Sequence, residues 1–201
     1  MKNINLYPFF CGVFAIYFKI MFKVEVIGKE NVPSEGGIVL CANHISNYDP
    51  IMIGVPLRHK RQVRFIAKKE LFQSKFGNFL FNSIGAFPVD RQAKMDMKAF
   101  KQAVKILKDG EILGIFAEGT RVKEGEEQTA KAGVSMFAVK GGAVVLPVAI
   151  SGTYKFRSKI TVRFGEPMEC NEYREGKITT EKMEAMTGVI MAKINEMKVI
   201  S

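Results

Sequence analysis

The sequence predicts an α/β domain with a mostly parallel sheet flanked by helices, together with an N-terminal hydrophobic, membrane-associating helical segment. Short apolar runs bounded by Gly or Pro alternate with helical patterns, the order expected of parallel strands joined by crossover helices. The 201 residues, 47% hydrophobic and 25% charged, are enough for one globular domain with a proper core. No repeat or Ser/Gly-rich or Pro-rich linker divides the chain after about residue 24.

The N-terminal stretch 4–22 is mostly apolar and aromatic. It is just long enough to cross a hydrocarbon core of about 30 Å, although Pro8 and Lys19 interrupt it. A secretory signal would end in a small-residue cleavage site, whereas this stretch runs on into Phe22 and Lys23. We therefore predict that residues 1–23 are a retained membrane anchor, spanning or monotopic, and that residues 24–201 form one domain. An ordinary buried helix is the alternative.

Apolar runs predict the strands in order: 24–27, 38–42, 63–67, 112–117, 143–150 and 160–164. The clearest helix lies between them at 95–108, with one apolar face and Gly110 as a stop signal. Methionines and isoleucines at three- and four-residue steps predict a closing amphipathic helix from about 181 to 198. The strongly apolar stretch 71–84 is interpreted as core, with the lining of an apolar channel or contact with the membrane as alternatives for part of it.

Basic residues exceed acidic ones by 30 to 20, which gives a net charge of +10 and favours a polyanionic partner. The aromatic side chains lie in apolar runs, apart from the basic stretches 58–69 and 155–163, and no nucleotide-binding glycine motif is present. We therefore expect no nucleic acid, and an anionic membrane surface or an acidic protein instead, with a solvated face as the alternative. The three cysteines are widely spaced and favour neither disulfides nor a metal site, which suits a reducing cytosol.

Functional groups of such folds lie in loops at the carboxyl ends of strands. The loop after 38–42 contains His44 and Asp49. On a continuous helix the two side chains would point about 140° apart, but a strand–turn–helix junction lets the carboxylate touch the imidazole. Asp49 before Pro50 also predicts a helix capped by Asp49. We predict a His–Asp dyad acting as general base, with a capped turn and an incidental histidine as the alternative.

Two further loops carry arginines suited to phosphate. After 112–117 come Glu118, Gly119, Thr120 and Arg121, where the guanidinium offers a planar fork and the glycine permits close backbone approach. A short extended run, 85–89, leads to Arg91. An ordinary turn and a surface Asp–Arg pair are the respective alternatives. A Cys41–His44 nucleophilic pair is the rival chemistry, disfavoured because the strand pattern buries the thiol.

Together, Asn43-His44 with Asp49, Gly85 to Arg91, Phe116 to Arg121 and Val145 to Val148 resemble in order and spacing the motifs of the glycerolipid acyltransferase family. The resemblance covers about residues 25–170 and is strongest to the bacterial 1-acylglycerol-3-phosphate acyltransferases. One departure is Ala117, where many members have Pro; it removes no reacting group.

The resemblance implies acyl transfer from an acyl carrier protein or coenzyme A thioester to the sn-2 hydroxyl of 1-acylglycerol 3-phosphate, giving phosphatidate without cofactor or metal. It makes His44 the base and Asp49 its orienter. The phosphorylated glycerolipid acceptor would meet Lys68, Arg91, Glu118, Gly119, Thr120 and Arg121. The expected location is the cytoplasmic face of the cell membrane. Another lysophospholipid or glycerol 3-phosphate as acceptor, and a non-catalytic lipid-binding protein, are the alternatives.

Overall fold

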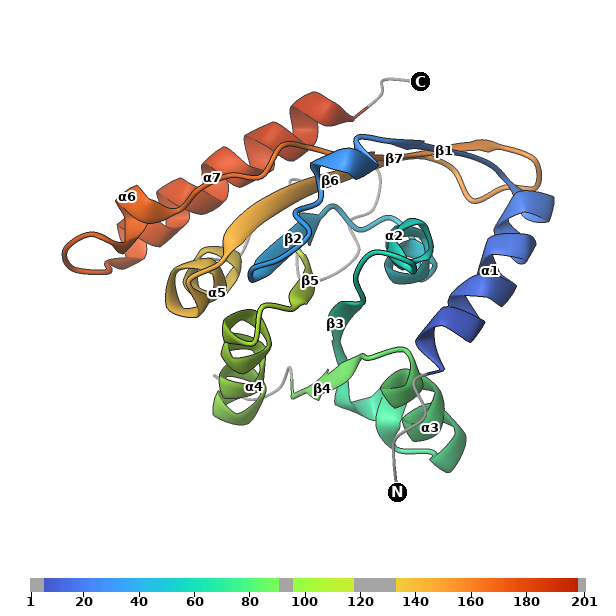
Figure 1. The fold of residues 1–201 in the computed structure, drawn as a ribbon, viewed down its shortest axis with the longest axis horizontal. Helices are drawn as coiled ribbons and strands as arrows, with labels where there is room; N and C mark the ends of the chain where they lie inside the picture. The colour runs from blue at the N-terminus through green and yellow to red at the C-terminus, as the bar shows by residue number, and fades with distance from the viewer. Residues whose placement is uncertain (1–5, 91–95, 118–132, 199–201) are drawn as a thin grey trace.

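A computed structural model describes residues 6–90, 96–117 and 133–198 (Figure 1). Its sheet has seven strands in the order β1-β7-β6-β2-β5-β3-β4. The strands are β1 (Lys23–Ile27), β2 (Ile38–Ala42), β3 (Val63–Lys68), β4 (Phe87–Val89), β5 (Ile112–Phe116), β6 (Val144–Gly152) and β7 (Lys159–Phe164). The helices are α1 (Tyr7–Met21), α2 (Asp49–Leu57), α3 (Lys75–Ser83), α4 (Met97–Lys108), α5 (Gly133–Gly141), α6 (Asn171–Arg174) and α7 (Thr180–Met197). Two short 3-10 helices are η1 (Lys29–Asn31) and η2 (Lys69–Phe72).

The predicted mostly parallel sheet is confirmed, since β6 and β7 alone among the described strand pairs run antiparallel. Each of the predicted strands is present, with its ends displaced by no more than two residues, and β4 is added where a short extended run was expected. The predicted helix 95–108 begins slightly later, at Met97, because the Asp96 carboxylate caps it by accepting from the backbone N–H groups of Lys98 and Ala99.

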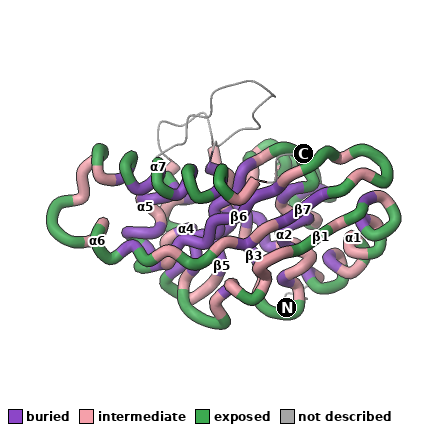
Figure 2. Tube along the Cα trace, turned by 90° about the horizontal axis from the view of Figure 1, so that it is seen from above, coloured by how far each residue is buried: buried purple, intermediate pink, exposed green. Residues whose placement is uncertain are grey.

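Helices cover both faces of the sheet, and alternate residues of the central strand β2 reach different layers. Val39 and Cys41 pack in a core with α4, α5 and α7, whereas Ile38 and Leu40 pack in a second core with α1 and α2. Every residue of β2 is buried, as expected for a strand covered on both sides. Figure 2 shows this buried interior along β6 between exposed outer turns.

Helix α1 lies at one end of the molecule, far from α7 (Figure 1). One side packs on the domain and buries Tyr7, Cys11 and Phe18. The opposite side exposes Phe9, Val13, Ile16 and Ile20, which recur at helical spacing and form what we call the outer stripe. Within the described residues, no helix has both the length and the apolar character needed to cross a membrane. The described part of the N-terminal stretch is therefore not an entirely buried helix.

Candidate active site

The loop between β2 and α2 is fixed to the sheet by the side chain of Asn43. Its amide nitrogen donates to the carbonyl of Ile150 at 2.9 Å, and its amide oxygen accepts from the N–H of the same residue at 2.8 Å. The buried side chain thus extends the pairing of β2 with β6 by one step beyond the last backbone pair, Ala42 with Val148. Because the loop starts from this anchored position, His44 leaves the sheet in one defined direction.

His44 and Asp49 meet across the turn, as the sequence predicts. The imidazole Nδ1 lies 2.7 Å from Asp49 Oδ2. A carboxylate only accepts hydrogen bonds, so Nδ1 carries the proton of the neutral ring and Nε2 carries the lone pair. Phe116, at the end of β5, stacks on the imidazole with ring centroids 4.0 Å apart and planes 19° apart. The ring is therefore held both at its edge and on one face.

Asp49 does not cap α2, so that part of the prediction is wrong. The helix begins at Asp49 itself after Tyr48, and its carboxylate turns back toward the loop. Oδ2 accepts from the backbone N–H groups of Ile45 and Ser46, each at 2.7 Å, in addition to the imidazole. Because the loop supplies these donors and the imidazole together, the carboxylate gains more bonds there than at the helix end. The turn is organised around the carboxylate.

Tyr154 completes the environment of Asp49, and sequence reasoning did not find it. Its phenol donates to Asp49 Oδ1 at 2.6 Å, so both oxygens of a carboxylate with no exposed surface are satisfied. Burial, followed by the charge and hydrogen bond of Asp49, raises the pKa of the Tyr154 phenol, which stays protonated as a donor. The only signal in the sequence is a tyrosine just after a predicted strand, 105 residues beyond Asp49.

The aromatic support beneath His44 depends on a glycine. Phe116 stacks on Phe65 with centroids 5.6 Å apart, and Phe65 lies directly over Gly114. A Cβ atom at Gly114 would come within 2.4 Å of the Phe65 ring, closer than such atoms approach in proteins. The absence of a side chain on β5 is therefore what lets the Phe65–Phe116–His44 stack form.

A cavity of about 1030 Å³ opens beside His44. Its walls are mostly apolar and come from α1, the His44 loop, α2, β3, the η2–α3 segment and β5. The large apolar side chains of the wall include Phe10 and Phe14 of α1, Phe65 and Phe116 beneath the imidazole, and Leu71, Phe81 and Ile84 of the 71–84 stretch. Ligand pockets commonly measure about 300–1,000 Å³, so this one has room for a long aliphatic chain.

The N-terminal helix contributes polar groups to the same cavity. Tyr7 donates from its phenol to the carbonyl of Gly54 on α2 at 3.3 Å. Burial raises the pKa of both Tyr7 and its cavity neighbour Cys11, so the two groups are neutral over the physiological range. Hence α1 is built into the wall of the cavity as well as carrying the outer stripe.

The remaining predicted residues divide into two sets. Lys68 stands exposed at the end of β3 and lines the cavity that contains His44. Arg91, Glu118, Gly119, Thr120 and Arg121 lie outside the described residues. Cys41 is fully buried, packs in the core beneath α4 and α5, and is not part of the cavity wall. This placement argues against a Cys41–His44 nucleophilic pair. No three His, Cys, Asp or Glu side chains of the described ranges are placed to hold a metal ion.

Comparisons with known proteins find similar sequences over most of the chain. The Acyltransferase family profile matches residues 23–151. A 1-acyl-sn-glycerol-3-phosphate acyltransferase of Bacillus subtilis is 33% identical over 198 residues, which covers 96% of this chain and 97% of that protein. A protein of the same name from Pseudomonas aeruginosa is 28% identical, covering 86% and 70% respectively.

A solved structure is similar as well. The crystal structure of the 1-acyl-sn-glycerophosphate (LPA) acyltransferase PlsC from Thermotoga maritima superposes with a TM-score of 0.68 at 25% identity. The superposition covers 99% of this chain and 80% of the Thermotoga maritima chain. The family match over most of the chain, the identity to the Bacillus protein and the shared fold lead to one conclusion: this chain belongs to the acyltransferase family.

Proposed function

We propose that the chain transfers an acyl group from an acyl carrier protein or coenzyme A thioester to the sn-2 hydroxyl of 1-acylglycerol 3-phosphate. The product is phosphatidate, a precursor in phospholipid synthesis. The observation that carries the proposal is the His44–Asp49 pair at the edge of a large apolar cavity in an acyltransferase domain. The names of the similar bacterial proteins support the same acceptor.

In the mechanism, Nε2 of His44 takes the proton of the acceptor hydroxyl while the hydroxyl oxygen attacks the thioester carbonyl. Asp49 holds the ring in the required tautomer and stabilises the imidazolium that forms. The tetrahedral intermediate collapses, the carbon–sulfur bond breaks, and the thiol leaves with the proton that the imidazolium returns. The oxygen ester replaces the thioester, so no covalent acyl-enzyme and no cofactor take part.

The substrates are divided between two environments. An acyl chain fits the apolar cavity, where burial of each methylene contributes about 0.8 kcal/mol. The phosphate of the acceptor is assigned to Lys68 at the cavity rim, with Arg91 and the Glu118–Arg121 segment as its further partners. Arg and Lys suit this task because they donate charge-assisted hydrogen bonds to phosphate oxygens.

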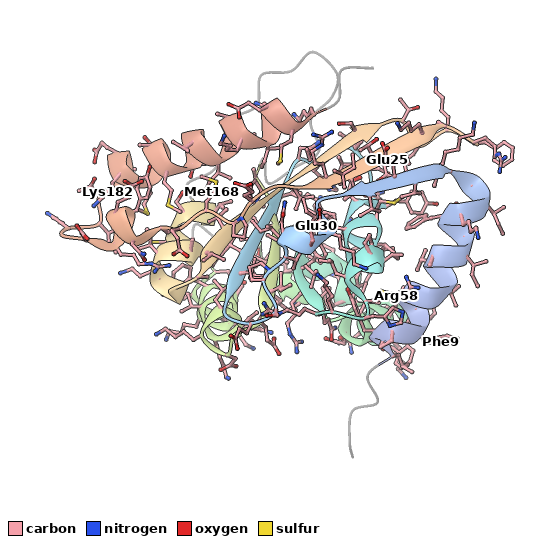
Figure 3. All side chains as sticks on the ribbon, turned by 45° about the horizontal axis from the view of Figure 1, so that its top comes forward. Phe9, Glu25, Glu30, Arg58, Met168 and Lys182 are labelled. Carbon is pink, nitrogen blue, oxygen red and sulfur yellow. The ribbon has the colours of Figure 1, made fainter. Side chains whose placement is uncertain are left out.

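The outer stripe of α1 supports a membrane location. Phe9 is 65% exposed and Ile16 is 64% exposed, which is unusual for large apolar side chains on one face of a helix. Figure 3 shows Phe9 pointing away from the body of the molecule. We propose that this face enters the interfacial region of the bilayer at the cytoplasmic side, so that α1 is a monotopic anchor and the cavity beside it faces the lipid.

The test follows phosphatidate by mass spectrometry, using purified protein in mild detergent with lysophosphatidate and either thioester. His44→Ala should abolish turnover, and His44→Gln, which keeps a polar side chain but no base, should do the same. His59→Ala is the matched control, because His59 is the second of two histidines and stands exposed beyond α2. Full activity in both His44 variants refutes the mechanism.

The same assay separates the alternatives. Turnover with glycerol 3-phosphate or another lysophospholipid, in place of lysophosphatidate, would replace the proposed acceptor while keeping the chemistry. Binding of lysophosphatidate without turnover from either thioester would favour a non-catalytic lipid-binding protein. The thioester that supports turnover identifies the donor.

A further inference from the structure

A second groove lies on the opposite flank of α1 from the catalytic cavity. Its volume is about 610 Å³, and it runs between α1, β1, the end of α2 and the β6–β7 loop. The floor is apolar and includes the buried rings of Phe18 and Phe22 and the side chain of Met52. Phe18 and Phe22 also contact the rings of Tyr48 and Tyr154, but no residue lines both the groove and the cavity beside His44. The groove is therefore distinct from the catalytic cavity.

The rim of this groove is positively charged. It is formed by Lys19, Lys23, Lys29, Arg58 and Arg157, and no Asp or Glu lines the groove. None of these cations forms an ion pair with a carboxylate of the described residues. Some basic residues outside the groove do have such partners: Arg64, Lys69, Lys105, Lys159 and Lys193. Because like charges repel, this concentration of cations around an apolar floor favours an anionic amphiphile.

Arg157 is held in an unusual conformation at the rim. Its φ of 61° makes it the one described residue other than glycine in the left-handed region. A glycine there would avoid the steric cost that an arginine bears. The loop is tied in place by two backbone bonds, from Arg157 N–H to the carbonyl of Met21 at 2.6 Å and from Lys23 N–H to the carbonyl of Ser158 at 2.9 Å. The guanidinium is thus carried to the groove by a fixed loop.

The position of the groove relative to the outer stripe determines its depth at a membrane. Lys19 follows Ile16 and precedes Ile20 on α1, so the cationic rim borders the stripe along the helix surface. If the stripe lies at the boundary of headgroups and acyl chains, the rim lies at the level of the phosphates. Neutral lipid would leave the cations without a counter-charge, whereas an anionic phospholipid supplies one and can place part of a chain on the apolar floor.

We propose that this groove binds one molecule of an anionic bilayer phospholipid, with its phosphate among Lys19, Lys23 and Arg157 and its acyl portion on Phe18 and Phe22. The inference rests on the membrane contact of α1 in the proposed function. Its occupant is a lipid of the surrounding bilayer and takes no part in acyl transfer. Binding there orients α1 and therefore the mouth of the catalytic cavity toward the membrane.

The test is flotation of the full chain with vesicles of phosphatidylcholine alone and of equimolar phosphatidylcholine and phosphatidylglycerol. We compare a groove variant, Lys19→Gln with Lys23→Gln and Arg157→Gln, with a control variant, Lys101→Gln with Lys108→Gln and Lys140→Gln. All of these side chains are exposed, and both variants remove the same charge from a net +10. Wild type and the control variant should bind the anionic vesicles about tenfold or more tightly than the neutral ones, and the groove variant should lose most of that preference.

A second measurement distinguishes a lipid in the groove from general charge attraction. Ala15→Trp fills the groove from α1 without changing the charge. In native mass spectrometry from neutral detergent with added phosphatidylglycerol, wild type should retain one lipid per chain and the tryptophan variant should not. Arg157→Gln, at an exposed loop position, makes the same comparison without altering α1. Retention of the lipid by both variants overturns the proposal.

The remaining outcomes are equally decisive. Equal losses of anionic preference in the groove and control variants would assign the effect to net charge and refute the groove. Equal binding of wild type to both vesicles would refute the groove and leave the membrane contact standing, whereas binding to neither would refute both. If the groove variant binds vesicles as the wild type does but loses turnover with the acyl carrier protein thioester alone, the groove binds the carrier protein and the lipid proposal is refuted. Acyl transfer to lysophosphatidate in detergent tests the proposed function separately.

Discussion

Replacing Tyr154 with Phe removes a single oxygen atom, and that atom is the one donor to Oδ1 of Asp49 in the described structure. The ring itself remains, so its contacts with Phe22 at 5.4 Å and with Tyr48 at 5.8 Å between centroids are preserved. The variant therefore isolates a hydrogen bond to a buried carboxylate from the packing around it. If Tyr154 positions Asp49, and Asp49 orients His44, catalysis must weaken although no reacting group is lost.

The size of the effect follows from the geometry. A hydrogen bond to a charged group contributes about 1.5–3 kcal/mol, and leaving a buried acceptor unsatisfied costs about 1–3 kcal/mol. Asp49 keeps three donors on Oδ2, all at 2.7 Å, so we expect the lower part of that range, about 1–2 kcal/mol of unfolding free energy. The melting temperature should fall by about 2–4 °C per kcal/mol. A small misplacement of the base should lower kcat by about tenfold to a hundredfold, with KM little changed.

The assay measures kcat and KM for phosphatidate formation together with thermal unfolding. Tyr17→Phe is the matched control, because it removes a phenol from the same aromatic cluster and breaks only the exposed 3.3 Å contact with Tyr48. It should keep the wild-type kcat. A Tyr154→Phe enzyme with wild-type kcat would show that the three hydrogen bonds to Oδ2 are sufficient to position Asp49 without the bond from Tyr154.

A spectroscopic readout separates positioning from a loss of stability. The Nδ1 proton of His44, shared with Asp49, should give a downfield resonance, and the spectrum is simple because the chain has two histidines. Without the phenol, the carboxylate becomes a stronger acceptor for this proton, so the resonance should move further downfield in Tyr154→Phe. An unchanged resonance in the folded variant would refute the connection from Tyr154 to His44.

Three other substitutions probe the stack, the cavity and the core. Gly114→Ala should lower kcat and cost about 1–3 kcal/mol in stability, because its methyl group displaces the ring packed over it. Gly188→Ala is the control and should be harmless, because the space around Gly188 is open. Equal melting temperatures of the two variants in calorimetry would contradict this prediction. Phe81→Ala should shift the preference in kcat/KM toward longer acyl chains, because it enlarges the cavity. Phe79→Ala should leave the preference unchanged, because the Phe79 side chain is exposed and lies outside the cavity wall. Competition between thioesters of different chain length measures the preference. Burial raises the pKa of the Cys170 thiol to about 11, so the folded state keeps a proton that the unfolded chain releases above about pH 8.5. The stability that this thiol contributes is complete below that pH and is lost as the pH rises toward 11. The free energy of unfolding of Cys170→Ala, measured by urea titration, should therefore fall less steeply with alkaline pH than that of the wild type. An equal fall in both proteins would count against the buried thiol.

The sequence by itself determined the class of the fold and the local chemistry. Strands such as 38–42 and 112–116 are short apolar runs ended by polar loops, and their periodicity depends on neighbouring residues only. The pairing of His44 with Asp49 is also local in sequence, because the two residues lie five positions apart on either side of a turn that lets their side chains meet. The family resemblance likewise rests on short motifs whose residues are neighbours in the sequence.

The tertiary structure alone decided the rest, because it depends on contacts between distant parts of the chain. Tyr154 reaches Asp49 across 105 positions, and nothing near either residue indicates the pairing. The Asp49 carboxylate is held in the loop by the nearby donors His44, Ile45 and Ser46, and only the fold adds the distant phenol that satisfies its second oxygen. Likewise α1 has a buried side, an outer stripe and two flanking pockets only once it lies against the sheet. Composition sets how apolar a helix is, whereas packing decides which of its faces remains for lipid.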